Sequence, residues 1–288
     1  MEQQKKVIGV DLGGTNMRAG RIYGHVLEAE AALPTPADAQ SQAETIEALV
    51  RVIEKVWSDE VRAIGIGVPS VVDREKGIVY NVANIPHWEE VPLRAMLEAR
   101  FGVPVQVDND ANCFALGERI FGIGQNYANF VGLTIGTGLG GGIIQQGKLL
   151  ADANCGSGEF GTLPYKEQTL EYYCSGSFFQ NIYGISGKEM YVRALQGDKE
   201  ALAAYRQLGL YVADAIKFVV LTVDPEMIVF GGSVAEAHAL FEASMQEGLQ
   251  DFPYPNSIKR LKICFSTLRN PGIFGAASLC YGTESEIK

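Results

Sequence analysis

The sequence predicts an α/β fold built from two similar halves. In each half, three segments with the pattern of strands in hairpin order are followed by alternating helices and strands. Each half also has a glycine-rich turn after its first strand, at 11–15 and at 136–142. No low-complexity tract or long linker interrupts the 288 residues, so we expect the halves to pack closely, with a cleft between them.

The first half is expected to begin with hairpin strands, because short apolar runs alternate with glycine and proline breaks. Strands are expected at 7–10, 17–23, 26–33, 62–68 and 103–107. A helix is expected at 38–57, where Ile46 and Leu49 begin an apolar stripe at a spacing of three and four residues. Two further helices are expected at 92–101 and 110–121.

The second half repeats this order after a boundary expected near 117–124. Strands are expected at 130–135, 141–145, 148–149, 226–230 and 261–265. A helical region lies between them, and 202–222 is its clearest member.

Composition and charge exclude several classes of function. A net charge of −10 argues against nucleic acid as a partner, since such binding needs clustered Lys and Arg. The apolar runs are too short to span a bilayer, and the polar first residues lead straight into a strand. We therefore expect a cytoplasmic protein that binds neither nucleic acid nor membrane. The three histidines and five cysteines lack metal-ligand spacing, so no structural zinc site is expected.

The first glycine-rich turn is interpreted as a phosphate-binding loop. Gly13 and Gly14 would let main-chain N–H groups approach a polyanion without an intervening Cβ. Thr15 and Asn16 add hydrogen-bond donors at the same bend, and Asp11 offers a carboxylate to a magnesium-bound water. A simple tight hairpin is the alternative.

The second glycine-rich turn is interpreted in the same way. Gly136, Thr137 and Gly138 begin a match to the dinucleotide fingerprint, but a strand is expected after the turn where that motif requires a helix. A near match to the Walker pattern fails because Leu149 stands where Ser or Thr must bind magnesium. A bulged hairpin is the alternative. Together, the two turns would form two sides of a phosphate-binding site.

Asp110 is the candidate general base. It follows an apolar strand and opens a helix, so a helix N-cap is the alternative interpretation. Asp108, Asn109 and Asp110 are three candidates for one helix cap, which leaves at least one of them for a catalytic or binding role. A carboxylate at the end of a strand can accept a proton from an attacking hydroxyl, and Asn109 can hold a neighbouring hydroxyl.

Other polar positions could bind a sugar or an adenosine. Glu159 and Glu171 lie in glycine-containing surroundings, and Asn84 supplies an amide on a turn. Solvated glutamates are the alternative for the first two. Gly231 and Gly232 follow a strand and could let the base of an adenosine lie against the backbone, or could simply form a close-packed corner.

Taken together, these segments resemble the ROK family of sugar kinases and repressors. Residues 11–15 match its first phosphate motif, and 67–70 resemble its G-x-P-G turn, with Ser70 in place of glycine. The other matching segments follow in the family's order, at 84–88, 109–112, 136–142, 158–161, 170–171, 175–176, 231–232 and 275–277.

The resemblance implies a duplicated actin-like ATPase fold, of the ribonuclease-H-like type, with two domains and an interdomain cleft. Residues 1–118 would form the N-terminal domain, joined by a final helix at about 272–288, and 119–271 would form the larger second domain. Asp110 resembles the base that activates the sugar's 6-hydroxyl. Ser70, Asn84, Asn109, Glu159 and Glu171 correspond to substrate-binding positions, and homodimers are common in the family.

The chain departs from the family's pattern in two ways. Thr162 stands where the family generally has a histidine that contacts sugar and ligates zinc. The cysteine-rich zinc loop before Glu171 is also missing. These departures predict a zinc-free variant whose sugar pocket differs near the anomeric end, with Thr162 hydrogen-bonded to a hydroxyl.

The sequence therefore predicts an ATP-dependent sugar kinase that phosphorylates a hexose or an N-acetylhexosamine. Its cofactors would be ATP and Mg²⁺, the metal carried with ATP and held through Asp11. Two alternatives are a non-catalytic sugar-binding protein and a transcriptional regulator. Family repressors carry a DNA-binding segment before the kinase-like part, and only ten residues precede Asp11 here.

Overall fold

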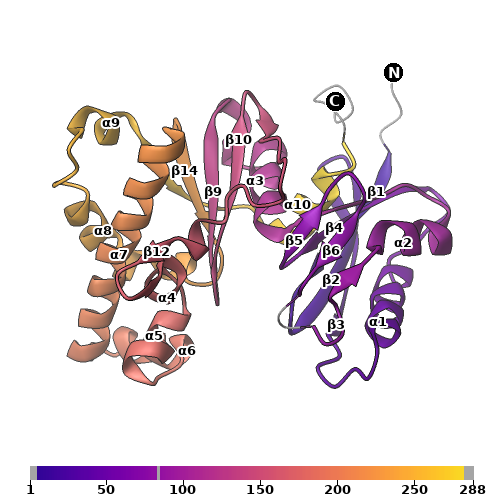
Figure 1. The fold of residues 1–288 in the computed structure, drawn as a ribbon, viewed down its shortest axis with the longest axis horizontal. Helices are drawn as coiled ribbons and strands as arrows, with labels where there is room; N and C mark the ends of the chain where they lie inside the picture. The colour runs from indigo at the N-terminus through magenta and orange to yellow at the C-terminus, as the bar shows by residue number, and fades with distance from the viewer. Residues whose placement is uncertain (1–4, 83–84, 282–288) are drawn as a thin grey trace. The chain divides into compact units, whose positions relative to one another are not determined.

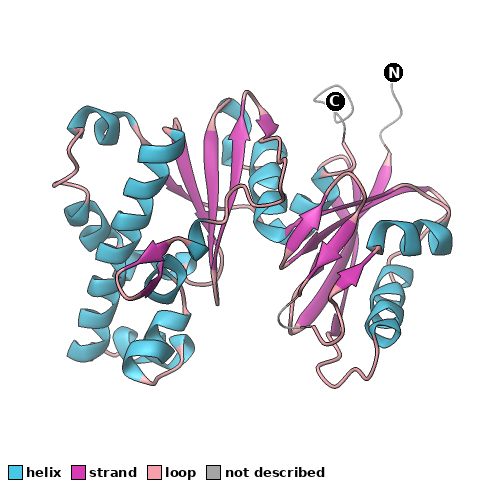
Figure 2. Ribbon diagram, in the orientation of Figure 1, coloured by secondary structure: helices cyan, strands magenta, loops and turns pink. Residues whose placement is uncertain are grey.

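The structure, a computed structural model, describes residues 5–82 and 85–281. Contacts within the chain divide it into two compact units. The first unit comprises Met1–Asn126, Leu149–Ser157 and Leu268–Lys288, and the second comprises Tyr127–Lys148 and Gly158–Thr267. Each unit contains its own mixed sheet with helices (Figure 2).

The first unit is built on a five-stranded sheet with the order β3-β2-β1-β4-β8. β1, β2 and β3 form an antiparallel meander, and β4 and β8 run parallel to β1. The strands are β1 Lys6–Leu12, β2 Asn16–Tyr23, β3 Val26–Pro34, β4 Val61–Val68 and β8 Val105–Asn109. All five were predicted, with small differences at their ends. A second sheet of β5 Val71–Asp73, β6 Ile78–Tyr80 and β7 Glu90–Val91 was not predicted.

Different helices cover the two faces of the first sheet (Figure 1). These helices are α1 Gln42–Glu54, α2 Leu93–Phe101, α3 Asp110–Ile120 and α10 Pro271–Ser278. Along β1, Ile8 and Val10 belong to the core formed with α1 and α2. Val7, which points to the opposite face, packs with Ile273 of α10. This alternation follows from the two-residue period of a strand.

Two glycines allow α10 to lie directly on the central strands. A Cβ at Gly9 of β1 would overlap the carbonyl oxygen of Ile273, and a Cβ at Gly65 of β4 would overlap that of Ala276. Both glycines are buried. The helix therefore packs backbone against backbone at this point, which no larger residue would allow.

The second unit repeats the topology of the first. Its sheet has the order β11-β10-β9-β14-β15, with β9 antiparallel to β10 and parallel to β14, which in turn is parallel to β15. The strands are β9 Phe130–Ile135, β10 Leu139–Gln145, β11 Lys148–Leu149, β14 Met227–Gly231 and β15 Lys262–Phe265. Because the strand order is that of the first sheet, the predicted duplication is confirmed.

The helix α7 (Lys199–Val223) is the main helix of the second unit, and its central part was predicted. Asp198 caps it, since its carboxylate accepts the N–H groups of Glu200 and Ala201. The remaining elements are α4 Leu170–Cys174, α5 Ser177–Tyr183, α6 Gly187–Leu195, α8 Glu242–Gly248, α9 Pro255–Arg260, the hairpin β12 Pro164–Tyr165 and β13 Gln168–Thr169, and the 3-10 helices η1 Ile123–Asn126 (in the first unit), η2 Phe160–Thr162 and η3 Ala235–Leu240.

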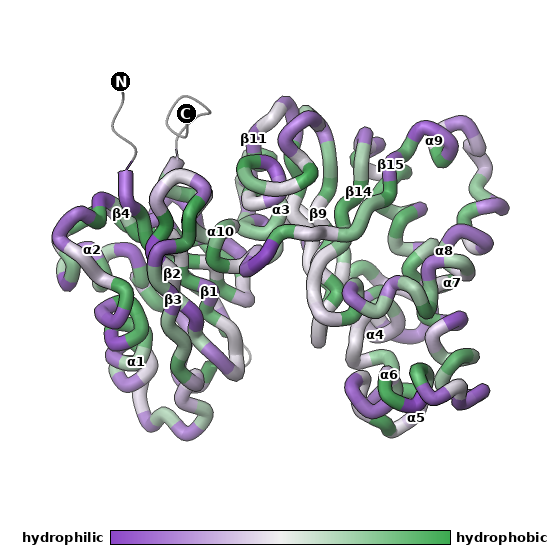
Figure 3. The backbone as a smooth tube through the Cα atoms, turned by 180° about the vertical axis from the view of Figure 1, so that it is seen from behind, coloured by the Kyte–Doolittle hydropathy of each residue, from purple (hydrophilic) through white to green (hydrophobic). Residues whose placement is uncertain are grey.

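Hydropathy follows burial in this unit. Figure 3 shows the buried strand β14 in hydrophobic colours, whereas α9 is largely hydrophilic and has no buried residue. In the part of the chain that the structure describes, none of the helices has the length and apolar character needed to cross a membrane.

Two predicted boundaries are wrong. The helix expected from residue 38 begins at Gln42, because Ser41 has an extended backbone and Gln40 donates its N–H to the Glu44 carboxylate. The strand expected at 141–145 begins already at Leu139. The last glycines of the 136–142 segment therefore lie in a strand and not in the turn.

The close approach of α10 gives a stability prediction. Gly65→Ala should lower the free energy of unfolding by about 2–3 kcal/mol or more, because an added methyl group here is overpacking against backbone. Urea denaturation would measure the change. Gly156→Ala is the matched control, since its Cβ would have no neighbour closer than 3.9 Å. Equal stability of the two variants would contradict the packing described for α10.

Candidate active site

In the first unit, the predicted residues lie at one edge of the sheet. β1, β4 and β8 run parallel, so their carboxyl ends meet at that edge, where Val68 pairs with Asn109. Asp11 is near the end of β1, Ser70 follows β4, and Asp110 follows β8. Ligand sites of open α/β sheets form outside the carboxyl ends of the strands.

The structure assigns different tasks to the three polar residues at 108–110. Asn109 is the helix cap, because its Oδ1 accepts the N–H of Ala111 at 2.8 Å and that of Asn112 at 3.3 Å. Asp108 is buried and accepts a hydrogen bond from Asn112 Nδ2 at 2.9 Å. Its burial raises the pKa of the Asp108 carboxyl. Asp110 is the first residue of α3 and half-buried, and its Oδ1 shares the N–H of Ala111 with Asn109, at 2.8 Å.

Sequence reasoning missed Arg74, which supports this segment. Its guanidinium lies 3.7 Å from the Asp108 carboxylate and donates to the carbonyl of Leu150 at 2.9 Å. Asp152 lies 3.8 Å from the same side chain. Arg74 sits in the turn between two short strands that were themselves not predicted, so no local pattern indicated it.

Ser70 is held between two backbone groups. Its hydroxyl donates to the carbonyl of Tyr80, and its own carbonyl accepts Nδ2 of Asn109 at 3.2 Å. The turn after β4 is thereby tied to the cap of α3. The predicted residue Asn84 lies outside the described residues.

The first glycine-rich turn is closed by a hydrogen bond from Gly13 N–H to the carbonyl of Asn16 at 2.9 Å. Neither Gly13 nor Gly14 has a positive φ, so left-handed backbone does not explain these glycines. Thr35, which the sequence did not indicate, fastens the turn by bonding to the carbonyls of Gly13 at 2.6 Å and Thr15 at 2.9 Å. Thr15 and Asn16 are exposed, and their groups are accessible to a ligand.

Asp11 lies next to the start of α10. A Cβ at Gly272 would overlap its carboxylate, so glycine lets α10 begin directly beside this side chain. Burial raises the pKa of Asp11, and the attraction of Arg18 across the β1–β2 pair only partly offsets this. Arg18 is itself bonded to Glu30 at 2.7 Å and to Asn270 at 2.6 Å. A cation bound at Asp11 would favour the charged carboxylate.

The second glycine-rich turn joins β9 to β10 and is anchored through its carbonyls. The carbonyl oxygen of Gly136 accepts a hydrogen bond of 2.7 Å from the N–H of Gly176. The carbonyl oxygen of Thr137 accepts one of the same length from the Ser177 hydroxyl. Gly136 N–H bonds to the carbonyl of Gly138 at 3.0 Å. A Cβ at Gly136 would meet no heavy atom within 4 Å, so this part of the turn is open.

The other glycines near this turn serve close packing. Glu171 accepts the N–H of Leu139 at 2.8 Å through Oε2, and a Cβ at Gly138 would overlap the same oxygen. A Cβ at Gly161 would overlap the carbonyl of Leu139. Residues predicted to bind sugar are therefore packed directly against the turn predicted to bind phosphate.

Glu159 and Thr162 lie at the two ends of one short turn. The Thr162 hydroxyl donates to the carbonyl of Glu159 at 2.8 Å. Thr162 and Glu171 are exposed, and Glu159 is half-buried. A Cβ at Gly161 would lie 3.4 Å from the Cβ of Glu171, which places these predicted residues on adjacent segments. In the described part of the chain, no three His, Cys, Asp or Glu side chains form a possible metal-ligand set.

Gly231 and Gly232 lie at the carboxyl end of β14. Gly231 pairs with Thr134 of β9, so this pair shares the sheet edge with the turn at 136–138. Gly232 has a φ of +89°, which favours glycine, and approaches the backbone of Ile135 closely. The close-packed corner is thus present, and the binding of an adenosine against this backbone stays a prediction.

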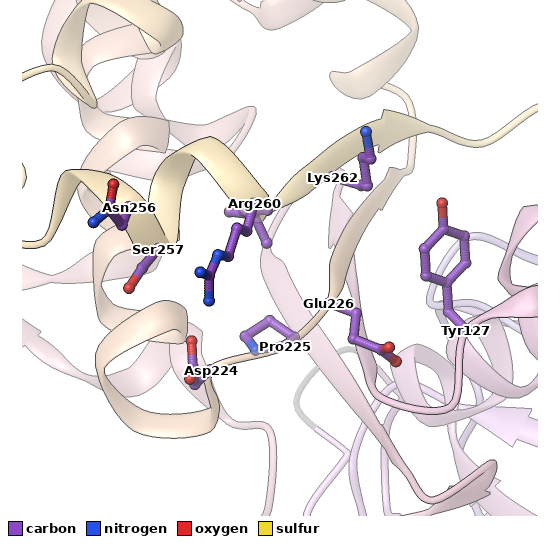
Figure 4. Close-up of a pocket in the computed structure, with 9 residues that line it drawn as sticks. Tyr127, Asp224, Pro225, Glu226, Asn256, Ser257, Arg260 and Lys262 are labelled. Carbon is purple, nitrogen blue, oxygen red and sulfur yellow. The ribbon is translucent and has the colours of Figure 1, made fainter.

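A pocket of about 520 Å³ lies at the opposite edge of the same sheet (Figure 4). Figure 4 shows Arg260 extending from the end of α9 toward the loop that carries Asp224 and Pro225. Glu226 and Lys262, near the amino ends of β14 and β15, also line it. None of the predicted site residues is among its lining residues.

Comparisons with known proteins show which family this chain resembles. The model of the ROK family matches residues 7–282. A glucokinase of Thermotoga maritima is 30% identical, with 95% of this chain and 96% of the relative covered. An N-acetyl-D-glucosamine kinase of Shigella boydii is 32% identical, with 81% and 85% covered.

A solved structure has the same fold. A ROK family glucokinase from Streptomyces griseus, in complex with glucose and AMPPNP, superposes with a TM-score of 0.82. It is 27% identical, and the match covers 95% of this chain and 98% of that one. The predicted fold class, a duplicated actin-like ATPase fold of the ribonuclease-H-like type, is confirmed.

The glycines around the second turn make a paired prediction. Gly136→Ala should leave the melting temperature unchanged, because its Cβ enters open space, but should weaken ATP binding if the turn holds phosphate. Gly161→Ala should lower the melting temperature by several degrees, since its Cβ would overlap backbone. Thermal denaturation and the KM for ATP measure the two effects. An unchanged KM in Gly136→Ala would argue against the phosphate role.

Asp11 gives a prediction about pH. A folded-state pKa above the ordinary 3.8 means that the charged carboxylate destabilises the fold. Below pH 3.8 the Asp11 carboxyl is protonated in both the folded and the unfolded state, and the fold has its full stability. As the pH rises through the raised pKa, the carboxyl becomes charged in the folded state and stability is lost. Asp11→Asn, without ligands, should therefore be more stable than the wild type at pH 7, and the difference should shrink as the pH falls toward 4. Denaturant titrations across this range test it; a less stable variant at pH 7 would contradict the assignment.

Proposed function

Because this chain belongs to the ROK family, we infer that it is a sugar kinase that transfers the γ-phosphoryl group of ATP to a hydroxyl of a hexose or an N-acetylhexosamine. The relatives are named glucokinase and N-acetyl-D-glucosamine kinase, which supports both sugar classes. The hydroxyl is proposed to be O6, with Asp110 as the base.

The placement of Asp110 carries this proposal. Asn109 Oδ1 accepts two N–H groups as the cap of α3, and Asp108 is buried against Asn112. Asp110 is half-buried, and its Oδ1 accepts the N–H of Ala111 at 2.8 Å, a bond that orients the carboxylate at the start of the helix. It lies at the carboxyl edge of the sheet, at the first residue of α3. A carboxylate in such a position can take the proton from the sugar hydroxyl as the oxygen attacks phosphorus.

The phosphates of ATP would be held by main-chain groups. The open space beside Gly136 would admit a phosphate group, and the exposed Thr15, Asn16 and Thr137 would offer donors. Gly231 and Gly232 would support the adenosine. Magnesium, when bound with ATP, neutralises phosphate charge, and Asp11 is the residue proposed to hold one of its waters.

The residues proposed to bind the sugar are Ser70, Asn84 and Asn109 of the first unit and Glu159, Thr162 and Glu171 of the second. The Asn109 oxygen already accepts two N–H groups, and one of its amide N–H groups is used by Ser70. Asn109 would therefore act toward the sugar as a donor through its second N–H. Thr162 would contribute a neutral hydroxyl.

Three features of the setting are part of the proposal. The acidic charge favours a small-molecule kinase over a nucleic-acid-binding regulator. Cytoplasmic location is proposed from the sequence pattern described above, and a homodimer from the family resemblance. The domain division at 118/119, with a C-terminal segment at about 272–288 that joins the first domain, is proposed on the same basis; the helix described in that segment is α10, which ends at Ser278.

The decisive variant is Asp110→Asn. We expect kcat to fall by about a hundredfold or more, because a general base contributes this much, while the KM for sugar stays within a few-fold. A coupled assay of ADP release across a panel of hexoses and N-acetylhexosamines measures both. Asp59→Asn, an exposed carboxylate of the same unit, is the control. A fully active Asp110→Asn enzyme would refute the base assignment, and sugar binding without ADP release would favour the non-catalytic alternative.

A further inference from the structure

A small hairpin lies between Thr162 and Glu171. Its strands are β12 (Pro164–Tyr165) and β13 (Gln168–Thr169), and Lys166 in its turn has a φ of +53°. The hairpin leads directly into α4, whose second residue is Glu171. Whatever fixes this hairpin therefore also fixes the start of α4.

The Lys166 ammonium lies over three tyrosine rings. It is 4.6 Å from the ring centre of Tyr211 on α7, 5.6 Å from that of Tyr165 and 5.7 Å from that of Tyr173 on α4. The rings also contact one another edge-on or tilted, with centroids 5.2–6.2 Å apart. A cation over aromatic faces at these distances is attracted to them.

A hydrogen bond joins the same hairpin to α7. The Tyr165 hydroxyl donates to Oδ2 of Asp214, and Lys217 holds the other carboxylate oxygen at 3.0 Å. Burial and the neighbouring carboxylate raise the pKa of Tyr165, so the hydroxyl keeps its proton. Asp214 and Lys217 lie within α7, the main helix of the unit.

The hairpin is connected through α4 to the turn at 136–138. Leu170 is fully buried, and its N–H bonds to the carbonyl of Leu163 at 2.8 Å. The next residue, Glu171, accepts the N–H of Leu139 at 2.8 Å. Leu139 immediately follows the turn.

We propose that Lys166 and Tyr165 are positioning residues: by clamping the hairpin onto α7 they hold Glu171 where its carboxylate fixes the Leu139 amide and hence the turn at 136–138. The term clamp refers to Lys166, Tyr165, Tyr173, Tyr211 and Asp214. The proposal rests on the proposed function in one respect, that this turn binds the phosphates of ATP and Glu171 the sugar. The clamp then sets the affinity for both substrates without touching either.

Three variants test the role of the charge. Lys166→Met keeps an apolar chain and removes the ammonium, Lys166→Arg keeps a cation that can lie over the rings, and Lys188→Met removes an exposed lysine of α6 as the control. We expect Lys166→Met to raise the KM for ATP and for sugar roughly three- to tenfold, with a smaller change in kcat. Lys166→Arg should restore values near the wild type, and Lys188→Met should change neither KM.

A second measurement needs no turnover. Hydrogen–deuterium exchange of peptides covering 136–142 should be faster in Lys166→Met and in Tyr165→Phe than in the wild type, because the Leu139 amide loses its fixed acceptor. Lys166→Arg and Lys188→Met should exchange like the wild type. Faster exchange in an enzyme that phosphorylates no sugar would support the clamp while refuting the proposed function. Unchanged exchange and unchanged KM values in Lys166→Met would overturn the clamp.

Discussion

The approach of α10 to the first sheet is the constraint on which this unit depends. Gly9 and Gly65 let the helix backbone lie on the two central strands, and Gly275 lets α3 approach α10 equally closely. α3 begins at Asp110, and α10 begins beside Asp11. Packing of backbone on backbone therefore holds both carboxylates at one sheet edge, with little room for the helices to slide. The chemistry proposed for this edge depends on residues that carry no functional group.

The second unit uses glycine in two physically different ways. At Gly161 and Gly232 the missing Cβ makes room for neighbouring backbone, whereas at Gly136 it leaves space that the protein does not fill. Only the second kind suits a turn that must admit a ligand. The Glu171–Leu139 hydrogen bond then joins the segment with the proposed sugar-binding glutamates to that turn. The two proposed substrate sites within this unit are thus parts of one packed structure.

Much of the fold could be predicted from the sequence because the strands of the two large sheets are apolar runs with glycine and proline breaks between them. The sequence placed Asp11 and Asp110 just after strands, but only the parallel pairing of β1, β4 and β8 brings them to one sheet edge with Ser70. Strands as short as β5, β6 and β7 contain too few residues to show an alternating pattern. Contacts such as that of Thr35 with Gly13 join positions far apart in the sequence, so no local pattern indicates them. The sequence could not tell which residue at 108–110 caps α3; in the structure Asn109 does so, and its Nδ2 also bonds to the distant carbonyl of Ser70. Where Cβ atoms would collide could not be known before the backbone was placed.

The order of segments along the chain has a consequence for biosynthesis. The second unit is formed by Tyr127–Lys148 and Gly158–Thr267, so all its strands emerge from the ribosome before α10. The first sheet emerges earlier still, but Gly9 and Gly65 face a helix that has not yet been made. During translation this apolar face of the first sheet stays uncovered until α10 has been synthesised. A nascent chain that stalls before residue 271 exposes the face to chaperones and to other nascent chains. The unit that is synthesised first is thus the last to be completed.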